Sequence, residues 1–504
     1  MSMRIAAVLL LCATAAEAAE NVETLTERSQ ARARAVVDRA ADALGGAAAL
    51  RGIKGVRLTL AGETWPRLQM PTAAPPFEAG RLDETLLLDL GGNRLKLEQR
   101  TDGAGFEGHN VIVIASAGGT NYDLRARVAT PIPTAQSSQQ QFVQYYRRIP
   151  NLILRQALER ATSLRHLGED TFEGKPHDVV TFVMADGQQV GLYVDRGTAL
   201  ISKYELVFTD PLTGEEASEI VFGDYAKTGA LTAPRRWEFR QAGDVLSKYA
   251  LSVAFDPPLD AAAFAVAAES FRTAQAAPAT LEPAVDELAP GVYVIRNVAG
   301  QNQNTLAVAF DDYVLAVEAP GSSNGADDVI ARIKEKIPGK PIRYVAMTHH
   351  HGDHIGGLRS FIAEGAEVVT TKGNRGVVET MAKAPQVDRL AKSPREVGFA
   401  FLENGRRVFT DGKRTVELID IGPNPHAHEM VIAYLPAEKI VFQGDLFGIP
   451  NNDAPPGPPQ ASTLAFAKAL DERKLTVDRI AAVHGRTATI AEFRAALKNG
   501  DGGD

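Results

Sequence analysis

Residues 348–357 read Thr-His-His-His-Gly-Asp-His-Ile-Gly-Gly and place four imidazoles and one carboxylate within six positions. Histidine accounts for only 10 of the 504 residues. The odds that a His-x-His-x-Asp-His pattern occurs by chance anywhere in the chain are therefore roughly one in several thousand. Imidazole and carboxylate groups are ordinary metal donors. The segment is predicted to be a metal-binding loop rather than a set of solvated or packed histidines.

Three later segments carry the same residue types: Pro425-His426-Ala427-His428-Glu429, Gln443-Gly444-Asp445 and His484-Gly485. Each follows a predicted strand, and loops at the carboxyl ends of strands in an α/β sheet can converge on one point. No predicted helix carries two of these residues at i, i+4 spacing, so the helix-borne HExxH type of zinc site is excluded.

From Gly291 onward, predicted strands alternate with predicted helices, which indicates an α/β sandwich. The expected strands are 292–296, 305–309, 313–318, 343–347, 367–371, 407–409, 414–420, 430–435, 440–443 and 479–483. The expected helices are 326–337, 358–364, 375–383, 463–473 and 491–498.

The order HxHxDH, His, Gly-Asp, His-Gly over about residues 289–498 resembles the metallo-β-lactamase superfamily of hydrolases. That resemblance implies an αβ/βα sandwich and two metal ions. It assigns His349, His351 and His426 to one metal and Asp353, His354 and His484 to the other, with Asp445 as the bridge and Asp353 also as the catalytic residue. The bridging Asp445 is similar to that of the glyoxalase II, lactonase and RNase Z branches, whereas the true β-lactamases lack it.

Two histidines need separate treatment. His426 and His428 both lie in the third motif, and counting back from the following strand, which ends at Leu435, favours His426 as the ligand. His350 lies between two predicted ligands, and alternate side chains of an extended segment face opposite sides. It is therefore expected to point away from the metals and to have a structural role.

The ligand types constrain the chemistry. Two divalent ions about 3.5 to 4 Å apart hold a bridging water whose pKa falls toward 7, which makes hydroxide available at neutral pH. Imidazole and carboxylate donors suit zinc first, with iron or manganese as alternatives. The expectation is thus a Zn²⁺ site with two ions per chain.

Residues 55–260 contain many alternating runs separated by turn residues, which predicts a mostly antiparallel β domain. One helical stretch, 138–163, is expected to be broken at Pro150. Successive strands such as 188–195 and 220–225 resemble the periplasmic half-barrel domains of the lipoprotein-carrier type. His109, His166 and His177 stand alone there and are predicted to be packing or surface residues. The expected division is 19–260 for this domain, 261–286 for a linker and 287–504 for the metal domain.

The amino terminus carries Arg4, an apolar run from Ile5 to Ala15 and the triplet Ala16-Glu17-Ala18. This pattern is typical of a secretory signal peptide, here residues 1–18, and the run is too short to span a bilayer. A periplasmic or secreted protein without stable membrane insertion is predicted. Cys12, the one cysteine, would be removed with the signal, so thiolate ligands and disulfides are excluded.

The formal net charge of −8 and the pI near 5.8 disfavour nucleic-acid binding, which leaves a small molecule as the expected partner. The oligomeric state is left open. Five prolines in residues 450–459 stiffen a segment that could form a wall of the site or a plain surface connection.

Three functions follow from these patterns. The favoured one is an exported dinuclear hydrolase that uses a metal-bound hydroxide on a small ester, lactone, thioester or amide. The second is an iron oxidoreductase similar to the sulfur dioxygenases, with one metal. The third is a carrier or binding protein with an accessory metal domain.

Overall fold

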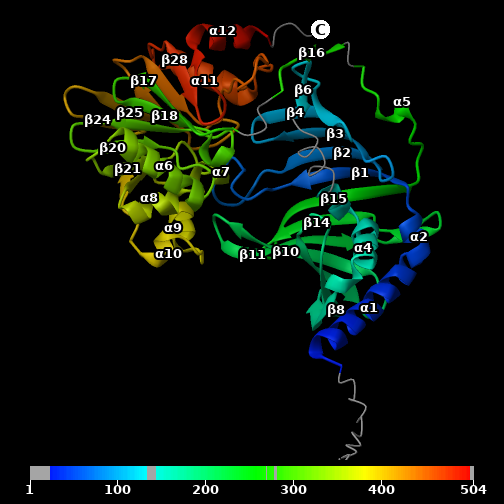
Figure 1. Cartoon of the computed structure of the whole chain (residues 1–504). Coiled ribbons are helices and arrows are strands. Elements are labelled where there is room, and N and C mark those ends of the chain that lie inside the picture. The colour runs from blue at the N-terminus through cyan, green and yellow to red at the C-terminus, as the bar shows by residue number, and fades with distance from the viewer. Residues whose placement is uncertain (1–22, 133–143, 268–269, 277–280, 500–504) are drawn as a thin grey trace, which may run out of the picture.

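The computed structural model describes residues 23–132, 144–267, 270–276 and 281–499 (Figure 1). The predicted signal peptide lies outside the described residues, as do residues 138–143 of the predicted helical stretch. Among the described residues, no helix combines the length and the apolar character needed to cross a bilayer.

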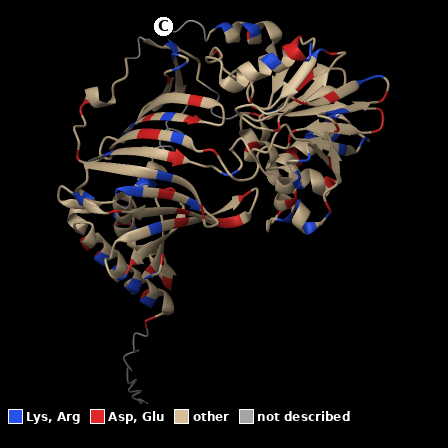
Figure 2. Cartoon of the chain, turned by 180° about the vertical axis from the view of Figure 1, so that it is seen from behind, with Lys and Arg blue, Asp and Glu red and all other residues tan. Residues whose placement is uncertain are grey.

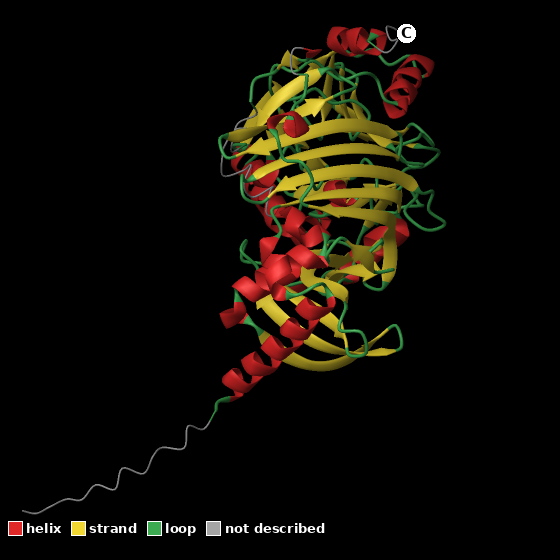
Figure 3. Ribbon diagram, turned by 90° about the vertical axis from the view of Figure 1, so that its right-hand side faces the viewer, coloured by secondary structure: helices red, strands yellow, loops and turns green. Residues whose placement is uncertain are grey.

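The amino-terminal half is built on one open, strongly curved sheet of 14 strands (Figures 1 and 3). Its order is β16-β6-β5-β4-β3-β2-β1-β15-β14-β11-β10-β9-β8-β7, and its pairings are antiparallel except for the parallel pair β16–β6. The strands are β1 Gly55–Thr64, β2 Gly80–Asp89, β3 Arg94–Gly103, β4 Phe106–Ala115, β5 Gly118–Asp123, β6 Val128–Ile132, β7 Arg165–Phe172, β8 Lys175–Val183, β9 Gln189–Asp195, β10 Ile201–Asp210, β11 Gly214–Gly223, β14 Arg236–Gln241, β15 Asp244–Phe255 and β16 Arg272–Thr273. The prediction of a large antiparallel β domain is confirmed.

Helices cover one end of the concave face of this sheet. They are α1 Leu25–Ala43, α2 Ala47–Gly52 and α4 Pro150–Glu159. Alternation decides which side chains meet them: Leu58 and Leu60 of β1 are buried in this core, whereas Arg57 and Thr59, which alternate with them, are exposed. A short hairpin is formed by β12 Ala226–Thr228 and β13 Leu231–Ala233.

Of the helical stretch expected over 138–163, the structure describes residues 144–163. A 3₁₀ turn at Tyr145–Arg148 precedes α4, and a second at Ala161–Ser163 follows it. The expected break at Pro150 is confirmed: Ile149 is extended, and Pro150 occupies the first turn of α4, where its missing N–H costs no hydrogen bond.

The carboxyl-terminal half contains two sheets packed face to face. The first comprises β17 Ala284–Ala289, β18 Val292–Arg296, β19 Thr305–Ala309, β20 Val314–Val317, β21 Ile342–Ala346, β22 Glu367–Thr370 and β23 Phe399–Phe401. The second comprises β24 Arg406–Thr410, β25 Thr415–Asp420, β26 Val431–Leu435, β27 Ile440–Gln443, β28 Arg479–Ala482 and β29 Ala488–Thr489.

Helices cover the outer face of each sheet and complete the αβ/βα sandwich that the sequence predicted. Against the first sheet lie α6 Ser323–Lys336, α8 Leu358–Glu364 and α9 Arg375–Lys383; against the second lie α11 Ala461–Glu472 and α12 Ile490–Lys498; the short helices are α7 Gly352–Ile355 and α10 Arg389–Lys392. In β20, Ala316 packs toward the helices and Leu315 toward the other sheet. Such strands are buried on both faces, which explains their continuous hydrophobic sequence.

Residues 261–286, the predicted linker, contain α5 Ala261–Phe264 and β16 before β17 begins. The Arg94 guanidinium lies 4.3 Å from the centre of the Phe264 ring, and Arg272 and Thr273 pair with β6. Arg272 also donates from Nη2 to the Asp453 carbonyl at 2.8 Å, which joins this segment to the loop after β27.

Candidate metal centre

The predicted ligands converge at one edge of the sandwich, each in a loop that follows a strand. The 348–354 segment follows β21, His426 follows β25, Asp445 follows β27 and His484 follows β28. Two groups of four result, and within each group the ligand atoms lie within 4.8 Å of one another. One group is His349, His351, His426 and Asp445; the other is Asp353, His354, Asp445 and His484. Asp445 belongs to both.

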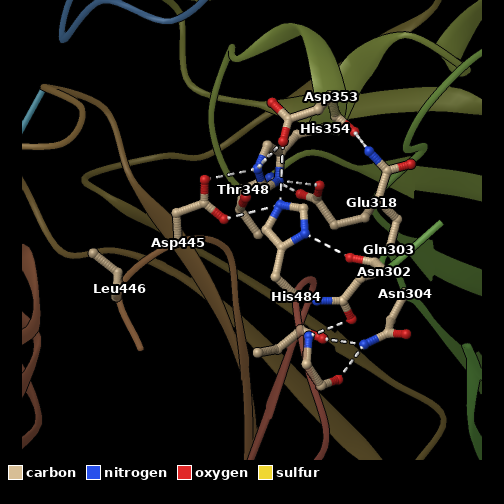
Figure 4. Close-up of polar contacts among 12 residues, drawn as sticks. Asn302, Gln303, Asn304, Glu318, Thr348, Asp353, His354, Asp445, Leu446 and His484 are labelled. Atoms are coloured by element: carbon tan, nitrogen blue, oxygen red, sulfur yellow. Dashed lines mark hydrogen bonds and ion pairs between the residues drawn. The ribbon is translucent and has the colours of Figure 1, made fainter. Parts of the chain in front are cut away.

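Asp445 is shared by the two groups, and Figure 4 shows its carboxylate turned toward the imidazoles of His354 and His484. Its carboxylate oxygens are 3.1 Å from His354 Nε2, 3.4 Å from His426 Nε2 and 3.3 Å from His484 Nε2. Gly444 permits the close approach, because a Cβ at that position would lie 2.6 Å from Thr348 Oγ1. A glycine before the aspartate is thus required by packing as well as by the motif.

Four imidazoles each donate one ring N–H to an oxygen outside the cluster. His354 Nδ1 donates to Glu318 Oε2 at 2.7 Å, and His484 Nδ1 donates to the Asn302 carbonyl at 2.7 Å. His351 Nε2 donates to the Met70 carbonyl at 2.9 Å, and His426 Nδ1 to the Ala104 carbonyl at 3.0 Å. In the neutral imidazole the other nitrogen then carries a lone pair, and in all four rings this nitrogen belongs to the cluster.

These donor atoms fit divalent metal ions. His351 Nδ1, His354 Nε2 and Asp445 Oδ1 are buried and have no hydrogen-bond partner. His349 Nε2 and His426 Nε2 lie 3.0 Å apart. Buried lone pairs facing one another are costly unless a cation lies between them. A pair of ions shared through Asp445 would satisfy all of these atoms.

The electrostatics of the site support the same conclusion. Burial and the neighbouring imidazoles lower the pKa of His349 and His351 well below the ordinary value. Although burial opposes it, the charge of His354 lowers the pKa of Asp445 well below its usual range. Burial likewise acts against the shift at His354, but Asp445 and Glu318 raise its pKa well above the ordinary value. His349, His351 and Asp445 thus have the protonation states that metal ligation requires, whereas His354 would lose a proton when it binds a metal.

Glu318, which the sequence reasoning missed, supports two parts of the site (Figure 4). Its side chain is fully buried, and it accepts from the Thr348 backbone N–H at 2.6 Å as well as from His354. Its backbone has φ of 80°, a conformation that non-glycine residues rarely adopt and that is often found at functional sites. An acidic residue directly after the apolar strand β20 was the available sequence signal.

A second set of supporting groups comes from the amino-terminal domain. Besides the Met70 and Ala104 carbonyls, Gln69 donates from Nε2 to Asp353 Oδ1 at 2.7 Å, and the Gly352 N–H donates to the Leu68 carbonyl at 2.8 Å. The ring of Phe106 meets that of His426 edge to face, with centroids 4.9 Å apart. Sequence reasoning found no catalytic cluster in this half and could not identify these contacts, because three of them use backbone carbonyls.

His428 and His350 both lie outside the two groups of candidate ligands. His428 is outside both groups of four, and its backbone N–H donates to the Pro71 carbonyl at 2.8 Å. His350 is buried and also outside both groups, and burial lowers its pKa to about 4. The proline-rich segment lines a cavity of about 180 Å³ together with Asp445, Phe447 and Phe106.

Comparison with known proteins gives one family match in the carboxyl-terminal half. Residues 320–484 match the model of the metallo-beta-lactamase superfamily, so the carboxyl-terminal domain belongs to that superfamily. No curated protein matches the chain significantly in sequence.

Solved structures with a similar fold cover 44% of this chain. They include a metallo-beta-lactamase from Pontibacter korlensis, with 17% identity, 100% of that chain covered and a TM-score of 0.34. They also include the mono-zinc form of the metallo-beta-lactamase FIM-1 from Pseudomonas aeruginosa, with 18% identity, 97% coverage and a TM-score of 0.33. A stereoselective inverting sec-alkylsulfatase, Pisa1, from a Pseudomonas species has 16% identity, 41% coverage and a TM-score of 0.33.

Proposed function

We propose that this protein is an exported dinuclear metallohydrolase that acts on a small ester, lactone, thioester or amide. The observation that carries the proposal is the convergence of the six other predicted ligands on Asp445, with buried donor atoms that lack hydrogen-bond partners. Zinc is the proposed metal, since the donors are imidazole nitrogens and carboxylate oxygens.

His349, His351 and His426 would hold one ion, Asp353, His354 and His484 the other, and Asp445 both. When bound, such a pair lowers the pKa of a coordinated water and polarises the substrate carbonyl. The side chains of Asp353 and His484 are each 33% exposed, whereas that of His354 is fully buried. Water can therefore reach the cluster from the side of Asp353 and His484.

Asp353 is the proposed catalytic residue. Burial opposes the shift, but the hydrogen bond from His484 and the charge of His354 hold the pKa of Asp353 well below its usual range. Gln69 fixes the other carboxylate oxygen. An ionised, oriented carboxylate at the open side of the cluster can hold the attacking water by a hydrogen bond.

A small-molecule substrate is favoured over nucleic acid. Figure 2 shows acidic and basic residues interspersed over both halves of the chain rather than a basic surface. The formal net charge of −8 agrees with this distribution.

The decisive experiment measures metal content together with hydrolysis of chromogenic ester, lactone, thioester and amide substrates. We expect close to two zinc ions per chain and activity that a chelator removes and zinc restores. One iron per chain without hydrolysis would instead establish the dioxygenase function. Mass spectrometry of the exported protein should show a chain that begins at Ala19; a chain that keeps Met1 would contradict the export proposal.

A further inference from the structure

The concave face of the amino-terminal sheet is open at the end that faces the metal centre. A cavity of about 360 Å³ lies there, and both His426 and Asp445 line it. Its other walls come from the amino-terminal domain, and they include Met70, Leu82, Gln99, Phe106 and Tyr249. The cavity therefore connects the metal centre with a surface that belongs to the other domain.

The register of the sheet forms this cavity. Leu82 of β2 pairs with Thr101 of β3, on the same face as the buried core. One step nearer the metal domain, Gly80 and Gly103 lie beside each other, and a Cβ on Gly103 would be 3.1 Å from the Gly80 Cα. Because these two positions have no side chains, nothing projects from them into the cavity. Space therefore remains where larger residues would fill the concave face.

The inner end of the cavity is closed by a polar pair. Gln99 pairs with Glu84 across β2 and β3 and donates from Nε2 to Glu84 Oε2 at 3.3 Å. Glu84 is 1% exposed, and Arg148 Nη2 lies 3.4 Å from the same carboxylate. The apolar core begins beyond this pair, at Leu86 and Leu97. The cavity thus leads from the metal centre and ends at Gln99.

The charges around the cavity disfavour an anion. Among the described residues that line it, Arg81 is the only lysine or arginine, and its Nε donates to Asp83 at 2.9 Å. Asp102 and Asp445 add two carboxylates to the lining. Away from the metal centre, an anionic group in this cavity would find no unpaired cation and would lie close to Asp102.

We propose that this cavity binds the acyl group of the substrate, and that the group is uncharged and mainly apolar. This inference rests on the proposed hydrolase function and adds its substrate class: neutral acyl compounds with a short chain. The volume lies near the lower end of the range for small-molecule sites, about 300 to 1,000 Å³, and so suits short rather than long chains. Leu82, Phe106 and Met70 determine the chain length, and Gln99 limits its depth.

The test compares 4-nitrophenyl acetate, 4-nitrophenyl butyrate and the anionic 4-nitrophenyl hemisuccinate on the zinc-loaded full chain. Burial of two further methylene groups should raise kcat/KM by about tenfold from acetate to butyrate. The hemisuccinate should be hydrolysed at least about tenfold more slowly than the butyrate, because a carboxylate would be buried without a partner.

Substitution of Leu82 assigns these effects to the cavity. Leu82→Trp should remove the advantage of butyrate over acetate, since it fills the space beside the metal centre. Leu82→Ala enlarges the cavity and should therefore shift the preference from 4-nitrophenyl butyrate toward 4-nitrophenyl hexanoate. Thr85→Trp is the matched control: Thr85 is exposed on the opposite face of the same strand, so all three rates should stay unchanged.

Binding of the neutral fluorophore N-phenyl-1-naphthylamine to metal-free protein separates the two proposals. Binding that Leu82→Trp abolishes and Thr85→Trp preserves supports the cavity even if no ester is hydrolysed, in which case only the hydrolase proposal fails. Ester hydrolysis that depends on neither chain length nor Leu82 would overturn the acyl-pocket inference and leave the hydrolase proposal intact. Absence of both binding and hydrolysis would overturn both.

Discussion

Two buried carboxylates, Glu318 in the metal domain and Glu84 in the facing sheet, show how differently the two halves use buried charge. Both oxygens of Glu318 accept hydrogen bonds, one from the Thr348 backbone and one from His354. Glu84 Oε2 faces Gln99 and Arg148, whereas its Oε1 is buried without a hydrogen-bond partner. Burial raises the pKa of Glu84, and Arg148 offsets this only in part.

The two halves thus form two kinds of site. The first depends on hydrogen bonds that orient individual side chains, and the second depends on the size and shape of an apolar cavity. In the metal domain each ligand imidazole is oriented by a hydrogen bond to a defined oxygen. Loss of such an outer partner typically lowers metal affinity by about 10- to 100-fold. In the sheet, the cavity is defined by apolar side chains and a pair of glycines. Changes to the first should alter metal binding, and changes to the second should alter substrate preference.

The largest effect should come from Asp445→Ala, because this residue belongs to both groups of ligands. We expect kcat/KM to fall by about 1,000-fold or more, since loss of an outer partner alone can cost about 10- to 100-fold. Metal analysis should show loss of at least one ion. Activity near that of the wild type would remove the bridging role from the proposal.

The next largest effect distinguishes His426 from His428. His426→Ala removes a ring nitrogen from the cluster and should lower activity by about 100-fold. This is the upper end of the loss of about 10- to 100-fold that follows mutation of residues that orient metal ligands. His428→Ala should stay within about threefold, because His428 lies outside both groups and its backbone N–H, which the substitution keeps, donates to the Pro71 carbonyl. A reversal of the two effects would mean that His428 is the ligand.

A smaller effect tests the contact between the two halves. Gln69→Leu removes the hydrogen bond to Asp353, so the zinc affinity of the Asp353 group should fall by about tenfold. Competition with a chromogenic chelator measures this change without use of activity. Gln99→Leu is the control, because Gln99 lies at the inner end of the cavity and should leave metal affinity unchanged. Equal losses in both variants would refute a specific role for Gln69.

The smallest effect concerns pH and Glu84. Because the pKa of Glu84 is raised in the folded state, the native protein binds more protons, and stability falls as the pH rises through the unfolded and then the folded pKa. Glu84→Gln should remove this loss. At pH 7 the variant should be more stable by about 1 kcal/mol, the low end of the cost of an unsatisfied buried acceptor, and near pH 4 the difference should shrink.

Unfolding followed by tryptophan fluorescence can measure this effect, since Trp65 and Trp237 both lie in the amino-terminal half. A difference that grows as the pH falls would show that Glu84 is charged and well paired in the folded state.

The sequence by itself determined the class of the carboxyl-terminal domain and its candidate ligands. Short polar motifs after apolar strands are local patterns, and the parallel order of strands brings their carboxyl ends to one edge whatever the loops contain. His349, His351, His426 and Asp445 could be proposed because side-chain identity and spacing carry that information. Glu318 was within reach on the same grounds, because it directly follows the strand that ends at Val317.

Only the tertiary structure decided the part played by the amino-terminal domain. The carbonyls of Met70 and Ala104 hold two imidazoles, and any residue type supplies a carbonyl, so no sequence pattern marks them. The cavity beside Leu82 likewise depends on the register that sets Gly80 beside Gly103 and on the docking of one domain against the other. Such long-range pairings are set by the whole sheet and not by the local sequence, which is why the sequence indicated a metal site but not the domain that completes it.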